Sequence, residues 1–394
     1  MELRRERRKK EKKLEKELRK TLKKINEEIY SEGFLNRSRI SEQYFTRKGK
    51  LGFAELILFQ ITAQKGSLQS TLKGFLNDLK IKTGYTKQAY SEARKKIKPS
   101  AFKYLNELFF LEYYKNHTFK EHKGYRVMAI DGSTLRLPNT NELKKTFGEI
   151  TNQTDTTLAA ARISALYDVE NEIIVDSVID KYKSSERDLA INHLKKLKEL
   201  KEKSGNNLRE LVLFDRGYPS LEMMLYLEKN NINYLMRVSG SFLKEVKEFK
   251  KSNKNEEILE IKLTKQRLNR IKLDELKENK ITNVKVRVIK IKLDSGEDEI
   301  LITSLMDKEE FSYNEFKTLY FKRWGVEINY DILKNIIEIE NFTGTKPTAI
   351  KQDFYATILV RNIKSLIESV AQVKVEEKNK MGTNKYNYKV NKNL

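Results

Sequence analysis

The sequence contains no cysteine and only three histidines, His117, His122 and His193. The lack of cysteine excludes disulfide bonds, thiolate nucleophiles and cysteine-ligated zinc, and so few histidines leave little imidazole chemistry. Any catalysis must therefore rely on carboxylates, lysine, tyrosine or hydroxyl groups. Carboxylates are the ligands that hard cations such as Mg²⁺ and Mn²⁺ prefer.

Long apolar segments are also absent. No run of about 18 or more apolar residues occurs, and the basic N-terminal segment lacks the apolar stretch of a signal peptide. We therefore expect a soluble, intracellular protein, and an anionic membrane surface is the weaker candidate for a partner.

Positive charge, in contrast, is plentiful. The 394 residues include 79 Lys and Arg against 56 Asp and Glu, which gives a net charge of +23. Such a surplus indicates a polyanionic partner, and nucleic acid is the first candidate. The chain is also longer than one compact core usually accommodates, which predicts two or three structural units.

The N-terminal third has helical periodicity. Residues 1–30 are rich in Lys, Arg and Glu, which is typical of a charged, solvated helix, with extra phosphate contact as the functional alternative. Residues 86–98 form a second basic helix, which either reads a DNA groove or has only a solvated basic face. Its candidate DNA contacts are Lys87, Gln88, Tyr90, Arg94 and Lys95.

From Tyr125 the pattern changes to that of an α/β fold. Three consecutive strands are expected first, and then a helix, a strand, a helix and a strand, ending near residue 238. Residues 240–305 alternate apolar and charged residues, which indicates an antiparallel sheet with one solvated face.

Two aspartates each end an apolar strand, Asp131 in AIDGST and Asp215 in LFDRGY. Sites on open sheets lie at strand ends, although one aspartate there is more often a turn former or a cap. After three antiparallel strands and a helical crossover, the first and fourth strands can lie side by side and parallel. We therefore expect the two aspartates to meet.

A long helix is expected to begin near Tyr313, with Ser312 and Glu315 as its capping box. One helix face, within about 60°, carries polar residues at offsets of 0, 3, 7 and 14. These residues are Tyr320, Arg323, Glu327 and Lys334. Their apolar neighbours predict that the helix is substantially buried, whereas the alternative is a surface stripe of ion pairs. The neighbours are Phe321, Trp324, Ile328, Leu333 and Ile336.

Three carboxylates suit a site for two divalent cations. Two cations about 3.5 to 4 Å apart can activate the attacking oxygen and stabilise the leaving oxygen of an in-line displacement at phosphorus. In this hypothesis Asp131 bridges both ions, while Asp215 and Glu327 complete one each. The basic and phenolic side chains of the helix would hold neighbouring phosphates. Asp331, one turn beyond Glu327, is the alternative third ligand.

Other polar residues receive weaker interpretations. Glu186 and Arg187 open a helix, where we expect a cap region with a supporting role near the metals. Asp176 and Asp180 are expected to be turn or surface residues, and His193 is expected to lie on a helix surface.

The Y-x2-R-x3-E-x6-K pattern of the helix resembles the signature of one branch of the DDE transposases of bacterial insertion sequences. AIDGST and FDRGY resemble the two aspartate motifs of that family, in the same order, and the resemblance covers roughly residues 50–370. It implies an RNase H-like catalytic core, a mixed sheet flanked by helices, with a β-rich insertion before the glutamate helix. It also implies a helical N-terminal domain that binds transposon ends.

The resemblance and the patterns together predict six segments. These are a basic charged helix (1–30), a helical DNA-end-binding domain (31–120), the first part of the catalytic core (121–239), the β-rich insertion (240–308), the glutamate helix and a following helix (309–372), and a basic tail (373–394).

The implied activity is cut-and-paste transposition with two Mg²⁺ ions per site, or Mn²⁺ as a substitute. Water cleaves at the transposon end, the freed 3'-hydroxyl forms a hairpin that a second water opens, and the 3'-hydroxyls then attack target DNA. The expected partners are double-stranded DNA, as terminal inverted repeats and as target, and a second copy of the chain in the DNA complex. The expected location is the bacterial cytoplasm, at the nucleoid.

Two alternatives stay open. One is an RNase H-like, metal-dependent nuclease without strand transfer, and the other is an inactive copy that only binds DNA.

Trp324 is the only tryptophan, so Tyr or Phe from the insertion would have to receive a flipped base during hairpin formation.

Overall fold

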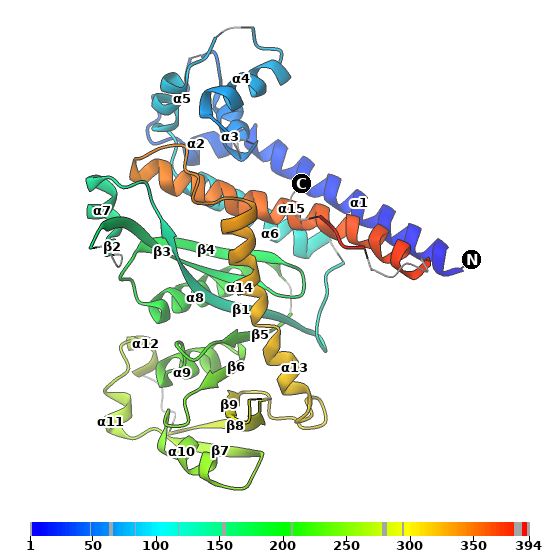
Figure 1. Ribbon diagram of the computed structural model, residues 1–394, viewed down its shortest axis with the longest axis vertical. Coiled ribbons are helices and arrows are strands. Elements are labelled where there is room, and N and C mark those ends of the chain that lie inside the picture. The colour runs from blue at the N-terminus through cyan, green and yellow to red at the C-terminus, as the bar shows by residue number, and fades with distance from the viewer. Residues whose placement is uncertain are drawn as a thin grey trace.

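The computed structural model describes residues 2–47, 49–62, 66–82, 84–116, 118–151, 155–205, 208–277, 282–293, 295–381 and 388–391. In this part of the chain a mixed sheet lies between layers of helices, as the sequence predicts (Figure 1). None of the helices described is both long and apolar enough to cross a membrane.

The nine strands of the described residues belong to one sheet, in the order β2-β3-β1-β5-β6-β9-β8-β7, with β4 paired to β3. The strands are β1 (Tyr125–Arg136), β2 (Glu149–Thr151), β3 (Thr157–Asp168), β4 (Ile173–Lys181), β5 (Arg209–Phe214), β6 (Asn233–Val238), β7 (Glu256–Lys262), β8 (Asn283–Lys292) and β9 (Asp298–Thr303). In the part β4-β3-β1-β5-β6, only β3 runs opposite to the other four strands. This is the arrangement expected of the RNase H-like core.

Both faces of the central strands are buried. Met128 and Ile130 of β1 pack into one core cluster, and Val127 and Ala129 pack into a second, because successive side chains of a strand point to opposite faces. Helix α8 (Glu186–Ser204) contacts β1 in the sheet, as does α14 (Trp324–Asp331). A strand that is covered on both faces has apolar residues at successive positions, which explains the apolar run in the first half of β1.

The predicted antiparallel strands of the insertion are present, and they continue the core sheet. β9 pairs antiparallel with β6, β8 with β9, and β7 with β8. Three helices lie among these strands, α10 (Lys244–Lys251), α11 (Lys265–Leu268) and α12 (Asp274–Lys277).

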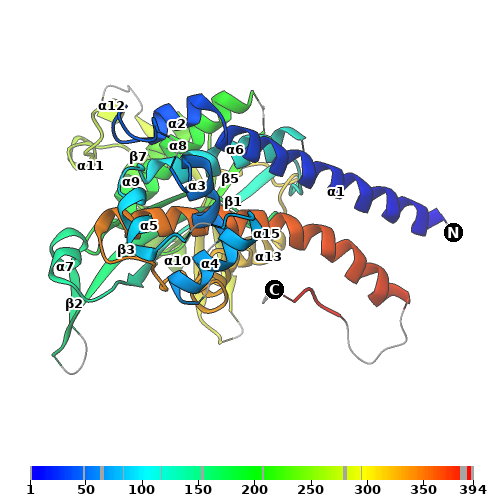
Figure 2. The ribbon, with the colours of Figure 1, turned by 90° about the horizontal axis from the view of Figure 1, so that it is seen from above.

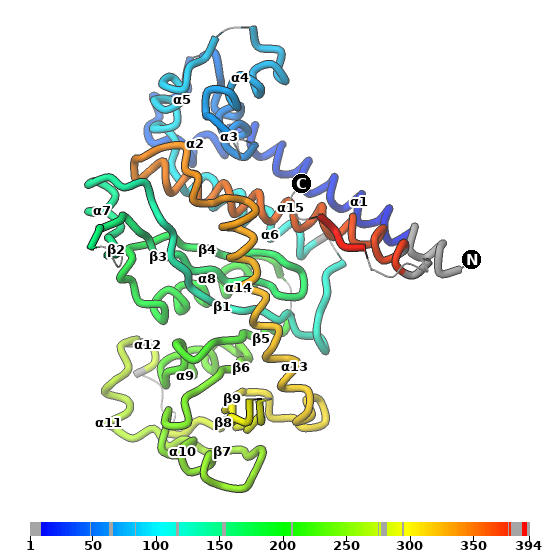
Figure 3. Tube along the Cα trace, in the orientation of Figure 1, coloured from blue at the N-terminus to red at the C-terminus, as the bar shows by residue number. Residues whose placement is uncertain are grey.

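The predicted long helix is wrong in one respect, because it is divided into three parts (Figure 3). These are α13 (Glu315–Phe321), α14 and a π-helix, η1 (Ile332–Ile336). Between α13 and α14 the N–H groups of Arg323 and Gly325 bond to carbonyls three residues back, which tightens the turn. In η1 the Ile337 N–H bonds to the Ile332 carbonyl, five residues back, which widens the helical turn there.

The burial of this segment also differs from the prediction. Phe321, Trp324 and Ile328 are 68%, 46% and 56% exposed, whereas Tyr320 and Arg323 are buried. The buried face is therefore the one that carries part of the polar signature, and three of its apolar neighbours face outward.

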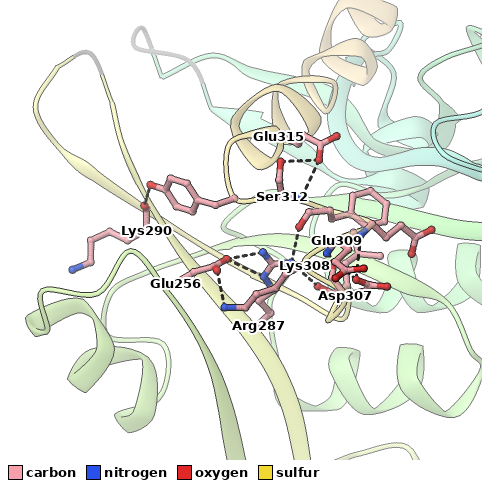
Figure 4. Close-up of polar contacts among 12 residues, drawn as sticks. Glu256, Arg287, Lys290, Asp307, Lys308, Glu309, Ser312 and Glu315 are labelled. Carbon is pink, nitrogen blue, oxygen red and sulfur yellow. Dashed lines mark hydrogen bonds and ion pairs between the residues drawn. The ribbon is translucent and has the colours of Figure 1, made fainter.

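A buried arginine ties the segment before α13 to the insertion strands (Figure 4). Arg287 on β8 donates to Glu256 Oε2 at 2.6 Å and to the Phe311 carbonyl at 2.8 Å. Of the predicted capping box, only the bond from the Ser312 N–H to Glu315 Oε2 is present, at 2.8 Å. The Ser312 hydroxyl donates to the same carboxylate at 2.9 Å, and α13 begins two residues later than predicted, after Asn314.

The N-terminal third is helical, as predicted, and the last helix packs with it. The N-terminal helices are α1 (Glu2–Ile29), α2 (Glu32–Ser38), α3 (Phe53–Thr62), α4 (Leu68–Asp78), α5 (Lys87–Arg94) and α6 (Ser100–Asn116), and the last helix is α15 (Pro347–Met381). Two further helices, α7 (Asn141–Phe147) and α9 (Leu221–Lys229), lie between strands of the sheet in the sequence. α1 lies along α15 (Figures 1 and 2), and Leu14 packs with Val370 and Val373. α1 is thus only partly solvated.

Candidate active site

The two aspartates lie on neighbouring strands, although Asp131 does not end its strand as predicted, because β1 continues to Arg136. β1 and β5 are parallel, and Ile130 lies opposite Phe214 at the last paired position, so Asp131 and Asp215 follow directly on adjacent strands. Both continue the side-chain row of Ala129 and Leu213, on the face packed by α13 and α14. The predicted parallel pairing of the first and fourth strands, here β1 and β5, is therefore confirmed, and it ends directly before the two aspartates.

The divided helix brings its polar residues to these strand ends. The Tyr320 hydroxyl donates to Asp215 Oδ1 at 3.3 Å, and the Lys334 ammonium donates to Ser133 Oγ at 2.7 Å. The buried Arg323 donates from Nη1 to Glu327 Oε1 at 2.6 Å. The contacts of Tyr320 and Lys334 lie near opposite ends of the divided helix, so its polar residues lie beside β1 and β5.

Burial and neighbouring charges shift the proton equilibrium of Asp131. Burial raises the pKa of its carboxyl group to about 6, although the Gly132 N–H and Arg323 act in the opposite direction. Glu327 and Glu186 add to the increase in pKa because their negative charges disfavour a third one nearby. Asp131 is thus a partly buried acid with two further carboxylates nearby.

Oxygen donors of this kind fit a hard divalent cation. Among the described residues, no three acidic or histidine side chains are grouped so as to enclose a metal ion. Glu327 is instead turned toward Arg323, which supplies the positive charge that it needs. The chemistry of the donors and the raised pKa of Asp131 fit a cation at the strand ends, because a cation would relieve the repulsion among these carboxylates.

A second ion pair flanks Asp215 and was missed in the sequence. Arg237 follows Met236, which lies opposite Phe214 on the neighbouring strand β6, and it pairs with Glu299 of β9 at 2.9 Å. Burial raises the pKa of Glu299, Arg237 lowers it, and Asp215 raises it further. The signal available was the position of Arg237 at the end of NYLMRV, a strand end like those of the two aspartates.

Glu186 lies near the aspartates, where a supporting role was predicted. It is the first residue of α8, which Ser185 caps, and its Oε1 accepts a hydrogen bond from Arg162 of β3 at 2.8 Å. Arg187 donates to the Gly217 carbonyl at 2.9 Å, in the turn that follows Asp215.

Two weaker predictions are wrong, and a third loses support. His193 is fully buried and its Nδ1 lies 2.7 Å from Asp176 Oδ2, so neither residue lies on the surface. The helix pattern could not reveal this, because the partner comes from β4. Asp331, the alternative third ligand, is exposed at the end of α14.

The predicted DNA-contacting helix is α5, and its side chains divide into two groups. Tyr90 and Arg94 are buried, and Arg94 donates to Asp353 Oδ1 at 2.6 Å, so these two residues face the protein and not a ligand. Lys87, Gln88 and Lys95 are exposed. The expectation of DNA contact therefore stands only for these three.

Comparisons with protein families and known proteins show which sequences this chain resembles. The family described as Transposase DDE domain matches residues 122–363. The chain is also similar to "Transposase InsG for insertion sequence element IS4" of Escherichia coli (strain K12), with 25% identity over 247 residues, 61% of this chain and 51% of that protein. The chain thus spans about half the length of this curated relative.

Among solved structures, the chain is similar to the piggyBac transposase in a cryo-EM synaptic complex with hairpin DNA. The TM-score is 0.47 at 11% identity, covering 89% of this chain and 75% of that chain. The family match includes Asp131, Asp215 and Glu327 and extends over more than half of the sequence. The chain therefore belongs to the family of transposases with a DDE domain.

Proposed function

We propose that this protein is a DNA transposase that cuts phosphodiester bonds at transposon ends and joins the ends to target DNA. The observation that carries the proposal is the pairing of β1 with β5, which sets Asp131 beside Asp215, with the signature helix against both. Membership of the DDE family supports it.

In this proposal Asp131, Asp215 and Glu327 hold two Mg²⁺ ions, or Mn²⁺ as a substitute. The cations supply activation of the attacking oxygen and stabilisation of the leaving oxygen. Tyr320 orients Asp215 through its hydroxyl group. Arg323 is buried at the same site, and its planar guanidinium is suited to a phosphate beside the scissile one.

Lys334 is the second phosphate contact of the proposal. Its ammonium group is held at Ser133, two residues beyond Asp131, and offers a point charge near the strand end. Lys87, Gln88 and Lys95 on the exposed side of α5 are proposed to contact the DNA backbone of the transposon end, together with the general positive charge of the chain.

The proposed reaction course is cut-and-paste through hairpin ends, within a homodimer that pairs the two ends. The DNA partners are the terminal inverted repeats and the target, in the bacterial cytoplasm at the nucleoid. Hydrolysis and strand transfer need the same arrangement of carboxylates, since both are in-line displacements at phosphorus by an oxygen nucleophile.

The replacement Glu327→Gln tests the role of the third acid. We expect cleavage of end DNA in Mg²⁺ to fall by at least about a hundredfold, with binding to the same DNA retained, because the amide cannot supply the carboxylate charge. Cleavage gels and a filter-binding assay measure the two properties. Asp331→Asn is the matched control, because this acid is exposed one turn further on and should leave cleavage unchanged.

Undiminished cleavage by Glu327→Gln would refute the proposed site. A precut end with a free 3'-hydroxyl separates transposase from nuclease, because only a transposase joins it to plasmid DNA. Cleavage without joining would favour the nuclease.

A further inference from the structure

The carboxylate of Glu186 lies between the residues that follow the two aspartates. A Cβ atom added to Gly132 would meet Glu186 Oε1 at 3.1 Å, and one added to Gly217 would meet Glu186 Oε2 at 3.8 Å. Gly132 is the residue after Asp131, and Gly217 lies two residues after Asp215. One carboxylate group from α8 therefore faces both strand ends.

The strand pairing explains how α8 reaches this place. β5 pairs with β1 only as far as Phe214, opposite Ile130, so β1 continues without this neighbour from Asp131 onward. Glu186 is the first residue of its helix and borders this opening, since it contacts Gly132 there.

Gly132 has no conformational reason to be glycine. Its φ lies outside the left-handed region, so alanine would suit its backbone. The restriction is steric, because a Cβ atom on residue 132 would lie 3.1 Å from Glu186 Oε1, which is closer than side-chain contacts normally are. Glycine at this position thus lets the Glu186 carboxylate lie directly against the backbone beside Asp131.

Two buried polar groups around Glu186 point to a ligand in this region. The Tyr218 hydroxyl and Arg162 Nε have no hydrogen-bond partner among the described residues, and Tyr218 is 1% exposed. Asp131 and Glu186 are the carboxylates whose charges act most strongly on this hydroxyl group. The hydroxyl therefore lies close to these carboxylates and is left without a bond. Buried polar groups normally find a partner, and none of the described residues supplies one for these two groups.

We propose that Glu186 is a fourth carboxylate of the cation site, an inference that rests on the proposed function. Arg162 holds the carboxylate at the strand ends through its Nη1 bond of 2.8 Å. With cations present, the negative charges of Glu186 and Asp131 gain a common counter-charge. The unpaired Tyr218 hydroxyl would then bond to water beside the cations, and the Arg162 Nε–H, which only donates, would bond to a DNA phosphate oxygen or to water.

Binding of Mn²⁺ to the full chain without DNA tests this proposal, measured by the loss of the free-ion signal in electron paramagnetic resonance. We expect Glu186→Gln to weaken Mn²⁺ binding about tenfold or more. Asp188→Asn is the matched control, since it removes an exposed acid from the same first helical turn and should stay within about twofold of the wild type.

Asp131→Asn separates failure of this inference from failure of the proposed function. If Asp131→Asn weakens Mn²⁺ binding and Glu186→Gln does not, the fourth carboxylate is wrong and the site stands. If the wild type takes up no Mn²⁺, or if neither variant changes the affinity, the proposed cation site itself is wrong.

A double-mutant cycle tests the link to Gly132. Gly132→Ala should weaken Mn²⁺ binding in the wild type by crowding the carboxylate, and should have little further effect in the Glu186→Ala background. Equal losses in both backgrounds would show that the added methyl group acts on Asp131 directly and would overturn the role of Glu186. Circular dichroism of each variant checks that the fold is retained.

Discussion

At the scale of single residues, the raised pKa of Asp131 means that its ionised carboxylate destabilises the folded chain. A carboxylate whose pKa is about 6 in the folded chain and about 4 in the unfolded chain binds a proton more readily when folded. Its contribution to stability is therefore fully present below about pH 4 and is lost as the pH rises through about 6.

The raised pKa of Asp131 in the folded chain leads to a prediction for the stability of the variant Asp131→Asn. In the presence of a chelator the variant should be more stable than the wild type at pH 7, by on the order of 2 kcal/mol, and the difference should shrink as the pH falls to about 4. Urea unfolding at several pH values measures it. A difference that does not depend on pH would contradict the environment described for Asp131. Added Mg²⁺ should stabilise the wild type and not the variant.

Among individual residues, the sequence indicated those whose position follows from a local pattern. Asp131 and Asp215 end apolar runs, so the topology of the strands was enough to bring them together. Tyr90 and Arg94 occupy a helix with a largely basic sequence. Arg94 is buried against Asp353 and Tyr90 against Phe59, and both partners lie far from them in the sequence. Such a partner leaves no trace in the helix itself.

At the scale of elements, the signature helix works as three joined segments. The tight turn at Arg323 and the wide turn in η1 change the direction in which side chains leave the helix, and Tyr320 and Lys334 both reach the strands. The spacing of apolar residues predicts a helix but does not distinguish turns of three, four or five residues, so the division could not be foreseen.

The position of this divided helix depends on Arg287. We expect Arg287→Met to lower the free energy of unfolding by about 3 kcal/mol, because the change leaves the buried Phe311 carbonyl without its donor and Glu256 with only Lys308 as an ion-pair partner. Lys244→Met is the control, since Lys244 and Glu248 are a largely exposed pair on α10 and contribute at most about 1 kcal/mol. Urea unfolding compares them, and equal losses would show that Arg287 is not an anchor.

At the scale of the whole molecule, a buried network joins α5 to the start of α15. Arg94 donates to Gln352 Oε1 at 2.7 Å and to Asp353 Oδ1 at 2.6 Å, and Gln60 of α3 also donates to Asp353, at 2.7 Å. The N-terminal helices and the helix after the signature segment are thus held in one arrangement by polar contacts as well as by apolar packing.

Adjacent residues of α5 should therefore behave differently. Arg94→Leu is expected to lower the free energy of unfolding by about 3 kcal/mol or more, because it leaves Asp353 buried without its cation. Lys95→Ala should change stability by less than about 0.5 kcal/mol and should weaken binding to end DNA, most clearly at low salt. Thermal unfolding and binding at two salt concentrations measure both effects, and the opposite pattern would contradict the division of α5 into a buried and an exposed side.

The alternating pattern of residues 240–305 was sufficient to predict strands but not where those strands would pair. Only β9 pairs with β6, and α10, β7, α11, α12 and β8 lie between these two strands in the sequence, so this pairing depends on the folded core.

The joining of β9 to β6 has a consequence for any shortened form of this protein. A chain without the insertion would keep Asp215 but would end its sheet at β6, which would then present a row of unpaired backbone N–H and C=O groups to solvent. Open edges of this kind recruit strands from other molecules, so the insertion also protects the core from aggregation.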